Sequence, residues 1–495
     1  MSRHVVVVGG GLAGISAALE CADSGARVTL LERRNRLGGL TWSFERSGRW
    51  IDNGQHVFLR CCDEYLRFLA RIGSSGDVEI QERLDVPVLS PAARAGDRPV
   101  LGRFARNSLP APLHLARSLL TYPHLSLQDR LGLGRATLAL RRLRLDDPAL
   151  DRQTFGSWLA AHGQSEASVE GLWDLITVPT VNLPSSEASL AVAAKVFQTG
   201  LLTDAAAADI GWSRVPLGRL HGDRAAAALA GAGVDVRLGQ QVDSVAPEGP
   251  AGSSERFTVR VGGGWVGSDA VVVAVPHNAA GGILPHGSVE HQDRLADLGN
   301  SSVVDVHVVF DRHVSPWPLM AAVRSPVQWV FDRTASSGTG PAPAEGRRSK
   351  PGGVPAPGGD GPGDRAAGAP QYLAVSLSAA DEVLGRHPDT IVASVVDELS
   401  RLLPGASRAR VVDSLVTKER HATFRATPGT AALRPPARTA HPGLAVAGAW
   451  TDTGWPATME GAVRSGRAAA RACLGARGAN LERTLQPELH TEEVA

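Results

Sequence analysis

Three glycines near the N-terminus, Gly9, Gly11 and Gly14, have the G-x-G-x-x-G spacing of loops that bind the pyrophosphate of a dinucleotide. The first glycine allows a tight turn, the second lets the backbone approach the phosphates, and the third lets a helix pack closely on a strand. Glu32 follows at the end of the next apolar run, where a carboxylate can accept hydrogen bonds from both ribose hydroxyls of adenosine. These residues predict dinucleotide binding and do not distinguish NAD from FAD.

The flanking pattern predicts the elements that must position these residues. The short valine run before Gly9 is typical of a parallel strand buried on both faces. The residues after the glycines predict a helix with Ile15 and Leu19 on one face and Gly25 beyond its end. The N-terminus of such a helix directs free N–H groups at phosphates.

A second glycine pair, Gly38-Gly39, follows Glu32 in the segment RRNRLGGLTWSF. A glycine-rich turn beside the first suits a cofactor that continues beyond its pyrophosphate toward a bulky far end, and this favours FAD. Considered alone, the pair is also compatible with a surface turn.

The rest of the chain divides by composition. Residues 76–205 contain Leu- and Arg-rich amphipathic stretches and are predicted to form a mostly helical insertion. Strand-like alternation in residues 300–332 and 372–378 predicts one continuous sheet. The Gly-, Pro- and Ala-rich residues 335–370 are predicted to be a disordered loop, and residues 476–495 a flexible tail.

Charge and cysteine usage exclude some classes of function. The formal net charge of the 495 residues is +1, which argues against nucleic-acid binding. The four cysteines have neither zinc-site nor disulfide-framework spacing, so we expect no metal, free thiols at Cys61 and Cys62, and a reducing cytosol. No window approaches the roughly 18 apolar residues of a membrane span. We therefore expect a soluble cytoplasmic protein, or one peripheral at the inner face of the cell membrane.

Three stretches carry a resemblance to a known family: GGGLAGISAALECADSGARVTLLERRNRLGG, DNGQHVFLRCCDEYLRFLARIG and WTDTGWPATMEGAVRSG. They resemble the flavin-containing amine oxidase and carotenoid desaturase superfamily, and within it the squalene-associated FAD-dependent desaturases, or hydroxysqualene dehydroxylases. The resemblance covers most of the chain. It implies an α/β fold of amine oxidase/phytoene desaturase type, in which a discontinuous Rossmann-like FAD-binding domain (1–75, 206–285 and 410–475) is interleaved with an α+β substrate-binding domain (76–205 and 286–409).

The resemblance also implies that both ends of the chain hold FAD. The turn after Gly448 would approach the ribityl chain, and a helix beginning near Ala457 would direct its N-terminus at the flavin's pyrimidine edge. The family usually has Asp directly after this glycine, whereas this chain has Ala449, and Asp452 is a candidate replacement. The implied FAD contacts are Gly9, Gly11, Leu12, Ala13, Gly14, Glu32, Arg33, Gly38, Gly39, Leu40, Gly54, Val242, Gly448, Asp452, Ala457, Thr458 and Met459.

The chemistry implied by the resemblance is reduction of hydroxysqualene, a C30 isoprenoid, to squalene in squalene and hopanoid biosynthesis. The leaving hydroxyl needs an acid, for which His56 is the first candidate, although it is equally suited to orienting the backbone or the flavin. Asp52 is a weaker candidate that suits a cap. No second nucleotide fingerprint is evident, so an external reductase or ferredoxin is expected to supply electrons.

Two further features have alternative interpretations. Trp42, Trp173, Trp212 and Trp455 suit either the lining of a substrate tunnel, where their faces stabilise a cation, or an ordinary core. The stretch from Leu125 to Leu145 suits either an anionic membrane surface or a helix packed on its own domain with arginines outward.

Three rival functions stay open at this stage. One is an oxidative carotenoid-type desaturase or isomerase, and another is a non-catalytic prenyl-binding protein like the Rab escort and dissociation-inhibitor proteins. The third is an amine oxidase, which is less favoured because Lys195, Lys350 and Lys418 lie in unsuitable contexts for a lysine beside the flavin.

Overall fold

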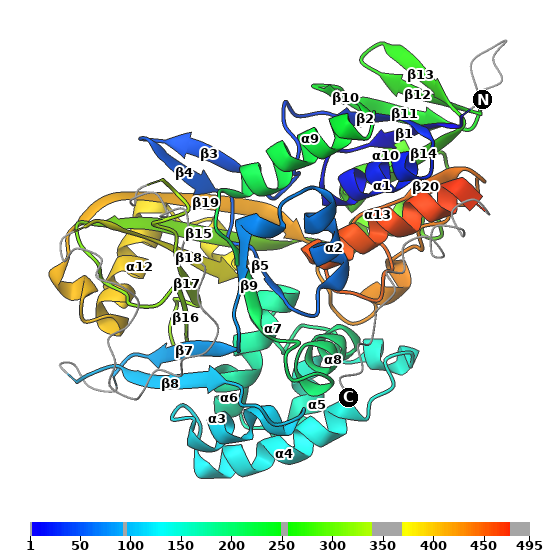
Figure 1. Cartoon of the computed structure of the whole chain (residues 1–495). Coiled ribbons are helices and arrows are strands. Elements are labelled where there is room, and N and C mark those ends of the chain that lie inside the picture. The colour runs from blue at the N-terminus through cyan, green and yellow to red at the C-terminus, as the bar shows by residue number, and fades with distance from the viewer. Residues whose placement is uncertain (1, 93–96, 249–255, 339–368, 476–495) are drawn as a thin grey trace, which may run out of the picture.

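The structure is a computed structural model that describes residues 2–92, 97–248, 256–338 and 369–475 of the chain. Most of the predicted loop at 335–370 and all of the predicted tail at 476–495 lie outside these described residues. The described residues form a parallel sheet with its helices, a larger mixed sheet and a helical region, as Figure 1 shows.

A five-stranded parallel sheet contains the N-terminal strand and carries helices on one face. Val5 and Val7 of β1 point toward helices α1, α9 and α13, whereas Val6 and Val8 point toward an antiparallel β11–β13 sheet and α10. Burial on both faces is why the strand consists of consecutive valines. The sheet order is β10 (Asp235–Leu238), β2 (Arg27–Glu32), β1 (His4–Val8), β14 (Ala270–Val273) and β20 (Leu444–Val446). The packed elements are α1 (Leu12–Asp23), α9 (Arg224–Gly231), α13 (Met459–Leu474), α10 (His277–Ile283), β11 (Val242–Ala246), β12 (Phe257–Val261) and β13 (Gly264–Ser268).

The two ends of the chain meet in this part of the molecule. Helix α13 lies alongside α1, as Figure 1 shows, and the Ser16 hydroxyl on α1 donates a hydrogen bond to the Val463 carbonyl on α13 at 3.1 Å. Gly466 makes the close approach possible, because a Cβ there would lie 2.2 Å from the Ala13 carbonyl oxygen. The C-terminal helix is therefore held against the helix that follows the first glycine loop.

A seven-stranded sheet forms the other large layer, and only its β7–β16 pairing is parallel. Helix α12 (Pro388–Leu402) covers one face, where it packs against Val304, Val306 and Val308. Asp305 alternates with these valines and so lies on the opposite face of the sheet. The strand order is β19 (Val411–Thr423), β15 (Ser301–Phe310), β18 (Gln371–Ser378), β17 (Trp329–Asp332), β16 (Leu319–Ala322), β7 (Asp85–Ser90) and β8 (Val100–Ala105).

Two features of this sheet differ from the sequence-based expectation. Strands β7 and β8 lie within residues 76–205, which were expected to be mostly helical, and β19 lies within 410–475, which was expected to belong to the FAD-binding domain. β7 pairs with β16 and β19 pairs with β15, which are partners far away in sequence, and local periodicity carries no information about such pairing. The two-domain division stays a prediction, with β19 belonging to the larger sheet.

The helical region occupies the lower part of the view in Figure 1, beside and below β7 and β8, and packs around Phe155, Trp173 and Phe197. Its helices are α3 (Ala116–Thr121), α4 (Leu127–Arg141), α5 (Phe155–Ala161), α6 (Glu166–Ser168), α7 (Asp174–Val181) and α8 (Leu190–Phe197). The remaining α-helices and strands of the described residues are α2 (Asp63–Arg71), α11 (Asp381–Leu384), the hairpin of β3 (Ser43–Arg46) and β4 (Arg49–Asp52), and a sheet of β5 (Val57–Leu59), β9 (Ile210–Ser213) and β6 (Val78–Ile80).

Candidate functional site

The three glycines of the N-terminal loop have different steric roles. A Cβ at Gly14 would lie 1.9 Å from the Gly9 carbonyl oxygen, and one at Gly9 would lie 2.4 Å from the Ala274 carbonyl oxygen. Gly9 and Gly14 are thus needed for the packing of loop, helix and strand. Around a Cβ at Gly11, in contrast, the Gly39 Cα at 3.8 Å is the nearest atom, so Gly11 adjoins open space at the start of α1.

Glu32 is buried at the end of β2 and faces the glycine loop. Its carboxylate accepts hydrogen bonds from the Gly10 N–H at 2.6 Å and the Arg34 N–H at 2.8 Å. A carboxylate has about four lone-pair sites, so two such bonds leave acceptor capacity for ribose hydroxyls. The Glu32 backbone carbonyl accepts a hydrogen bond from the Gln240 N–H. Val242, which is buried at the start of β11, follows Gln240 closely in the sequence.

The second glycine turn lies against the first, as its sequence predicts. The Gly38 N–H donates to the Gly10 carbonyl at 2.9 Å, and a Cβ at Gly39 would lie 2.9 Å from the Gly11 Cα. Leu40, the next residue, is half-buried. The two turns therefore form one continuous glycine-rich surface.

Arg36 is a site residue that the sequence analysis missed. It donates to the Gly39 carbonyl at 2.9 Å, and its guanidinium lies 4.1 Å from the centre of the Trp42 ring. Burial, with the nearby charge of Arg34, lowers the pKa of Arg36 to about 10. Arg33, the arginine named from the resemblance, is exposed instead. Arg36 could have been recognised from the sequence by its position immediately before Leu37 and the Gly38-Gly39 pair. This position buries the aliphatic part of the Arg36 side chain.

The C-terminal segment forms a turn and then the N-terminus of α13. The Gly448 N–H donates to the Ser465 hydroxyl at 2.8 Å, and the Thr458 hydroxyl caps the helix by accepting from the Gly461 N–H at 3.2 Å. Ala457 and Met459 are half-buried beside this cap. Asp452 is exposed and accepts from the Gly454 N–H at 3.2 Å, so its carboxylate serves the turn itself.

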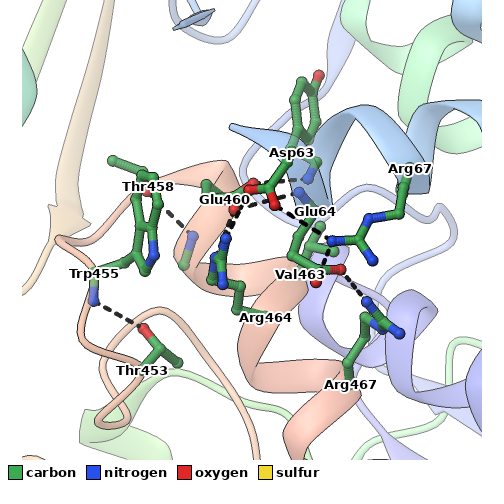
Figure 2. Close-up of polar contacts among 12 residues, drawn as sticks. Asp63, Glu64, Arg67, Thr453, Trp455, Thr458, Glu460, Val463, Arg464 and Arg467 are labelled. Atoms are coloured by element: carbon green, nitrogen blue, oxygen red, sulfur yellow. Dashed lines mark hydrogen bonds and ion pairs between the residues drawn. The ribbon is translucent and has the colours of Figure 1, made fainter. Parts of the chain in front are cut away.

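Glu460 fixes the start of α13 on helix α2, as Figure 2 shows. Its buried carboxylate accepts from the Tyr65 N–H at 2.7 Å and the Glu64 N–H at 3.3 Å, both at the N-terminus of α2, where a negative charge is stabilised. Arg464 donates to the same carboxylate at 2.5 Å and lies 4.8 Å from the centre of the Trp455 ring. Burial raises the pKa of Glu460, and this network offsets part of that cost.

The segment from Asn53 to His56 connects the glycine turns to the seven-stranded sheet. The Asn53 N–H donates to the Trp42 carbonyl at 2.8 Å, and the Gln55 N–H donates to the Asp305 carboxylate on β15 at 3.2 Å. A Cβ at Gly54 would lie 3.3 Å from an Asp305 carboxylate oxygen. Asp305 therefore borders this segment from the face of the sheet opposite α12.

His56 is half-buried, and its Nδ1–H donates to the Gly54 carbonyl at 3.1 Å. Burial lowers the pKa of His56 below its usual range, so the ring is neutral at pH 7. A neutral imidazole is a poor proton donor, which favours the orienting interpretation of His56 over the acid.

The other candidate residues have structural partners. Buried Asp52 pairs with the Arg333 guanidinium at 2.6 Å and also accepts from the Leu217 N–H at 2.9 Å. Trp173 lies in the core of the helical region and donates to the Gln164 side chain at 3.0 Å. Trp212 is half-buried on β9. Within the described residues, no group of three or more His, Cys, Asp or Glu side chains is placed to hold a metal ion.

The residues present fit the expected FAD. Gly11 adjoins open space at a helix N-terminus, and Glu32 has spare acceptor sites at the ribose end. At the other end, the Gln55 side-chain nitrogen is buried without a hydrogen-bond partner among the described residues. An unpaired buried amide is costly unless a ligand acceptor satisfies it, and a flavin ring offers such acceptors.

Comparison with known proteins supports this interpretation. The chain matches the family described as flavin-containing amine oxidoreductase over residues 12–474. It is 28% identical to the hydroxysqualene dehydroxylase of Rhodopseudomonas palustris, over 96% of this chain and 99% of the relative. It is 25% identical to that of Zymomonas mobilis, over 94% and 98%. The zeta-carotene desaturase of a Synechocystis strain is 24% identical over 95% and 97%.

Solved structures of oxidases share the fold. A putrescine oxidase variant superposes with a TM-score of 0.67 at 17% identity, over 96% of this chain and 99% of that one. Cyclohexylamine oxidase from Brevibacterium oxydans has a TM-score of 0.65 at 19% identity, over 98% and 100%. With the family match over nearly the whole chain, these findings confirm the predicted fold and cofactor. The chain belongs to the flavin-containing amine oxidoreductase family and is an FAD-dependent oxidoreductase.

Proposed function

We propose that the protein reduces hydroxysqualene to squalene, a step of squalene and hopanoid biosynthesis. The observation that carries the proposal is the similarity, over nearly full length, to relatives named hydroxysqualene dehydroxylase. FAD, once reduced by an external electron donor, supplies the hydride that replaces the leaving hydroxyl. The protein has to hold the cofactor and the isoprenoid, exclude water and provide a proton.

The chain's own residues suit these tasks. The two glycine turns and Glu32 bind the nucleotide half, and the cap of α13 fixes the C-terminal segment beside them. The segment from Gly54 to His56 lies between these turns and the face of β15 that carries Asp305. The face of β15 toward α12 is filled by hydrophobic core side chains. We therefore expect the substrate to bind at this junction, on the opposite face of β15.

Anaerobic single turnover tests the proposal. The FAD of the purified protein is reduced with light, hydroxysqualene is added in detergent, and the visible flavin band is followed while lipids are extracted. We expect the yellow colour to return with squalene formed in an equal amount. If the flavin stays bleached and the lipid is unchanged, the proposal that the protein reduces hydroxysqualene is wrong.

Oxidative desaturation of a related polyene is the second candidate. The similarity to the zeta-carotene desaturase of Synechocystis over 95% of this chain supports it. Incubation of the oxidised protein with phytoene-like polyenes distinguishes the two, because desaturation bleaches the flavin whereas dehydroxylation restores its colour. The family membership disfavours the alternative of a non-catalytic prenyl-binding protein without flavin.

We also propose that helix α4 contacts an anionic membrane from which the isoprenoid is taken. Its inner face, with Leu133, Ala136 and Leu140, is buried in the helical core. Its outer face exposes a leucine stripe flanked by exposed arginines, the pattern of an interfacial helix. The stripe is Leu127, Leu131 and Leu138, which are 69%, 68% and 47% exposed, and the arginines are Arg135, Arg141 and Arg142. In the described ranges, no helix is long and apolar enough to cross a bilayer.

Replacing Leu127, Leu131 and Leu138 with asparagine is expected to reduce sedimentation with phosphatidylglycerol vesicles at least tenfold. Full burial of one leucine is worth about 1.5–3 kcal/mol, so losing three insertions outweighs the remaining arginine attraction. Trp265→Ser, which removes an exposed aromatic side chain on β13, is the control and should sediment like wild type. Equal sedimentation of the triple variant and the wild type would rule out this surface.

A further inference from the structure

We propose that Asp305 is the proton donor to the leaving hydroxyl of the isoprenoid. The inference rests on the dehydroxylation proposed above and assigns its acid. It comes from the position of a buried carboxyl group at the junction between the glycine turns and the seven-stranded sheet.

The position of Asp305 is fixed by three elements. It lies in the middle of β15, directly between Ser376 on β18 and Thr417 on β19, and is 1% exposed. Its carboxylate accepts from the Gln55 N–H at 3.2 Å and lies beside Gly54, where a Cβ would be 3.3 Å away. Because Gly54 has no side chain, the carboxyl group reaches the segment that the family resemblance places beside the flavin.

The carboxyl group is poorly stabilised as an anion. Burial, and to a lesser extent the negative charge of Asp52, raise the pKa of Asp305 to about 7, although hydrogen bonds from Ser376 and Gln55 act in the opposite direction. A pKa in this range leaves a protonated fraction of the carboxyl group at neutral pH, which suits a general acid. His56, on the same segment, is neutral under these conditions.

The titratable and charged groups around Asp305 come from every element packed against it. Asp52 is at the end of β4, and its charge is balanced by Arg333 after β17. The others are His307 on β15, Tyr372 on β18, Glu419 on β19 and His56. Burial lowers the pKa of His307 and raises that of Tyr372, so both are neutral at pH 7. A pKa of about 7 makes Asp305 a group of this cluster that exchanges a proton in the neutral range.

The Asp305 proton passes to the substrate hydroxyl, the C–O bond breaks with its electron pair on oxygen, and water leaves. The hydride supplied by reduced FAD forms the new C–H bond, so the carbon gains two electrons and the cofactor loses two. The Asp305 carboxylate then regains a proton from solvent.

The test is Asp305→Asn in the FAD-loaded protein, because asparagine keeps the shape and the acceptor for the Gln55 N–H. Anaerobic single-turnover rates of flavin reoxidation by hydroxysqualene are measured from pH 5.5 to 9. We expect a loss of at least about 100-fold at pH 6.5, the lower end of what general acids contribute. The wild-type rate should fall as pH rises through about 7, where Asp305 loses its proton, and the variant should lack that transition.

Asp413→Asn on neighbouring β19, which removes a half-exposed partner of Arg49, is the matched control and should keep the wild-type rate and pH profile. If wild type converts hydroxysqualene and Asp305→Asn stays within threefold of it with the same profile, the assignment is wrong while the function stands. If wild type itself yields no squalene, the proposed function is wrong.

If wild type yields no squalene, a measurement without substrate still tests whether Asp305 titrates near neutral pH. The folded state favours the protonated carboxyl group over the carboxylate. We therefore expect wild type to lose stability relative to Asp305→Asn, seen as a lower unfolding midpoint, as pH rises from about 4 to about 7. A pH-independent difference would show that Asp305 does not titrate there and would overturn the assignment.

Discussion

Gly466→Ala is expected to lower the free energy of unfolding by about 3 kcal/mol or more and to reduce the FAD retained on purification. The new Cβ would lie 2.2 Å from the Ala13 carbonyl oxygen and 2.9 Å from the Ser16 Cβ. Both belong to α1, so the clash is relieved only by moving α13 away from it. Such overpacking costs about 1–3 kcal/mol or more, and the backbone oxygen here has no rotamer to escape to. FAD binding suffers because the same movement separates the N-terminal loop from the C-terminal segment.

Gly134→Ala provides the matched control. Gly134 is also inside a helix, α4, but a Cβ there would have no atom within 4 Å. The same change should therefore stabilise the protein by up to about 1 kcal/mol, the helix propensity difference between the two residues. Urea unfolding of both variants, with flavin absorbance per protein, measures the contrast. Equal stabilities would show that α1 and α13 are not held at the distance described.

Arg333→Met is expected to cost about 3–5 kcal/mol, because it leaves the Asp52 carboxylate buried without its counter-charge. The Arg333 and Asp52 side chains are 9% and 5% exposed and are joined at 2.6 Å. Arg333 also donates to the Ser213 carbonyl at 2.9 Å, so it connects the residue after β17 to β4 and β9. Thermal unfolding of the FAD-free protein measures the loss without a contribution from bound cofactor.

Two comparisons identify the cause of this loss. Adding Asp52→Asn to Arg333→Met removes the uncompensated charge and should recover at least half of the lost stability. Arg103→Met breaks an ion pair with Asp85 whose partners are 59% and 42% exposed, and it should cost less than about 1 kcal/mol. If Arg333→Met lowers the stability no more than Arg103→Met does, the buried Arg333–Asp52 pair does not stabilise the fold as described.

Residues 4–32 were predictable because local rules determine them. The valine run, the glycine spacing and the helix pattern each depend on neighbours within a few residues, and the structure has β1, α1 and β2 in the predicted order. The strands within 300–332 and 372–378 followed from alternation in the same way. The C-terminal segment was associated with the glycine loop by its resemblance to a family, since nothing local indicates a partner so distant in the chain.

Tertiary structure decided the features that depend on long-range pairing and on burial. The joining of β7, β8 and β19 into one sheet depends on partners that local periodicity does not specify. Arg36 lies on the glycine turn while Arg33 is exposed, although both belong to one run of polar residues. Strand-like alternation in residues 300–332 predicted the strand that contains Asp305, but only the tertiary structure brought the Asp305 carboxylate beside Gly54.

By itself, then, the sequence determined a dinucleotide-binding α/β protein with a second glycine turn suited to FAD. The tertiary structure decided where charge is buried. Asp52 is paired with Arg333, whereas Asp305 is left beside Gly54 with a pKa raised to about 7. The physical reason is that a pKa depends on desolvation and on charges within a few ångströms, and both depend on which distant segments pack together.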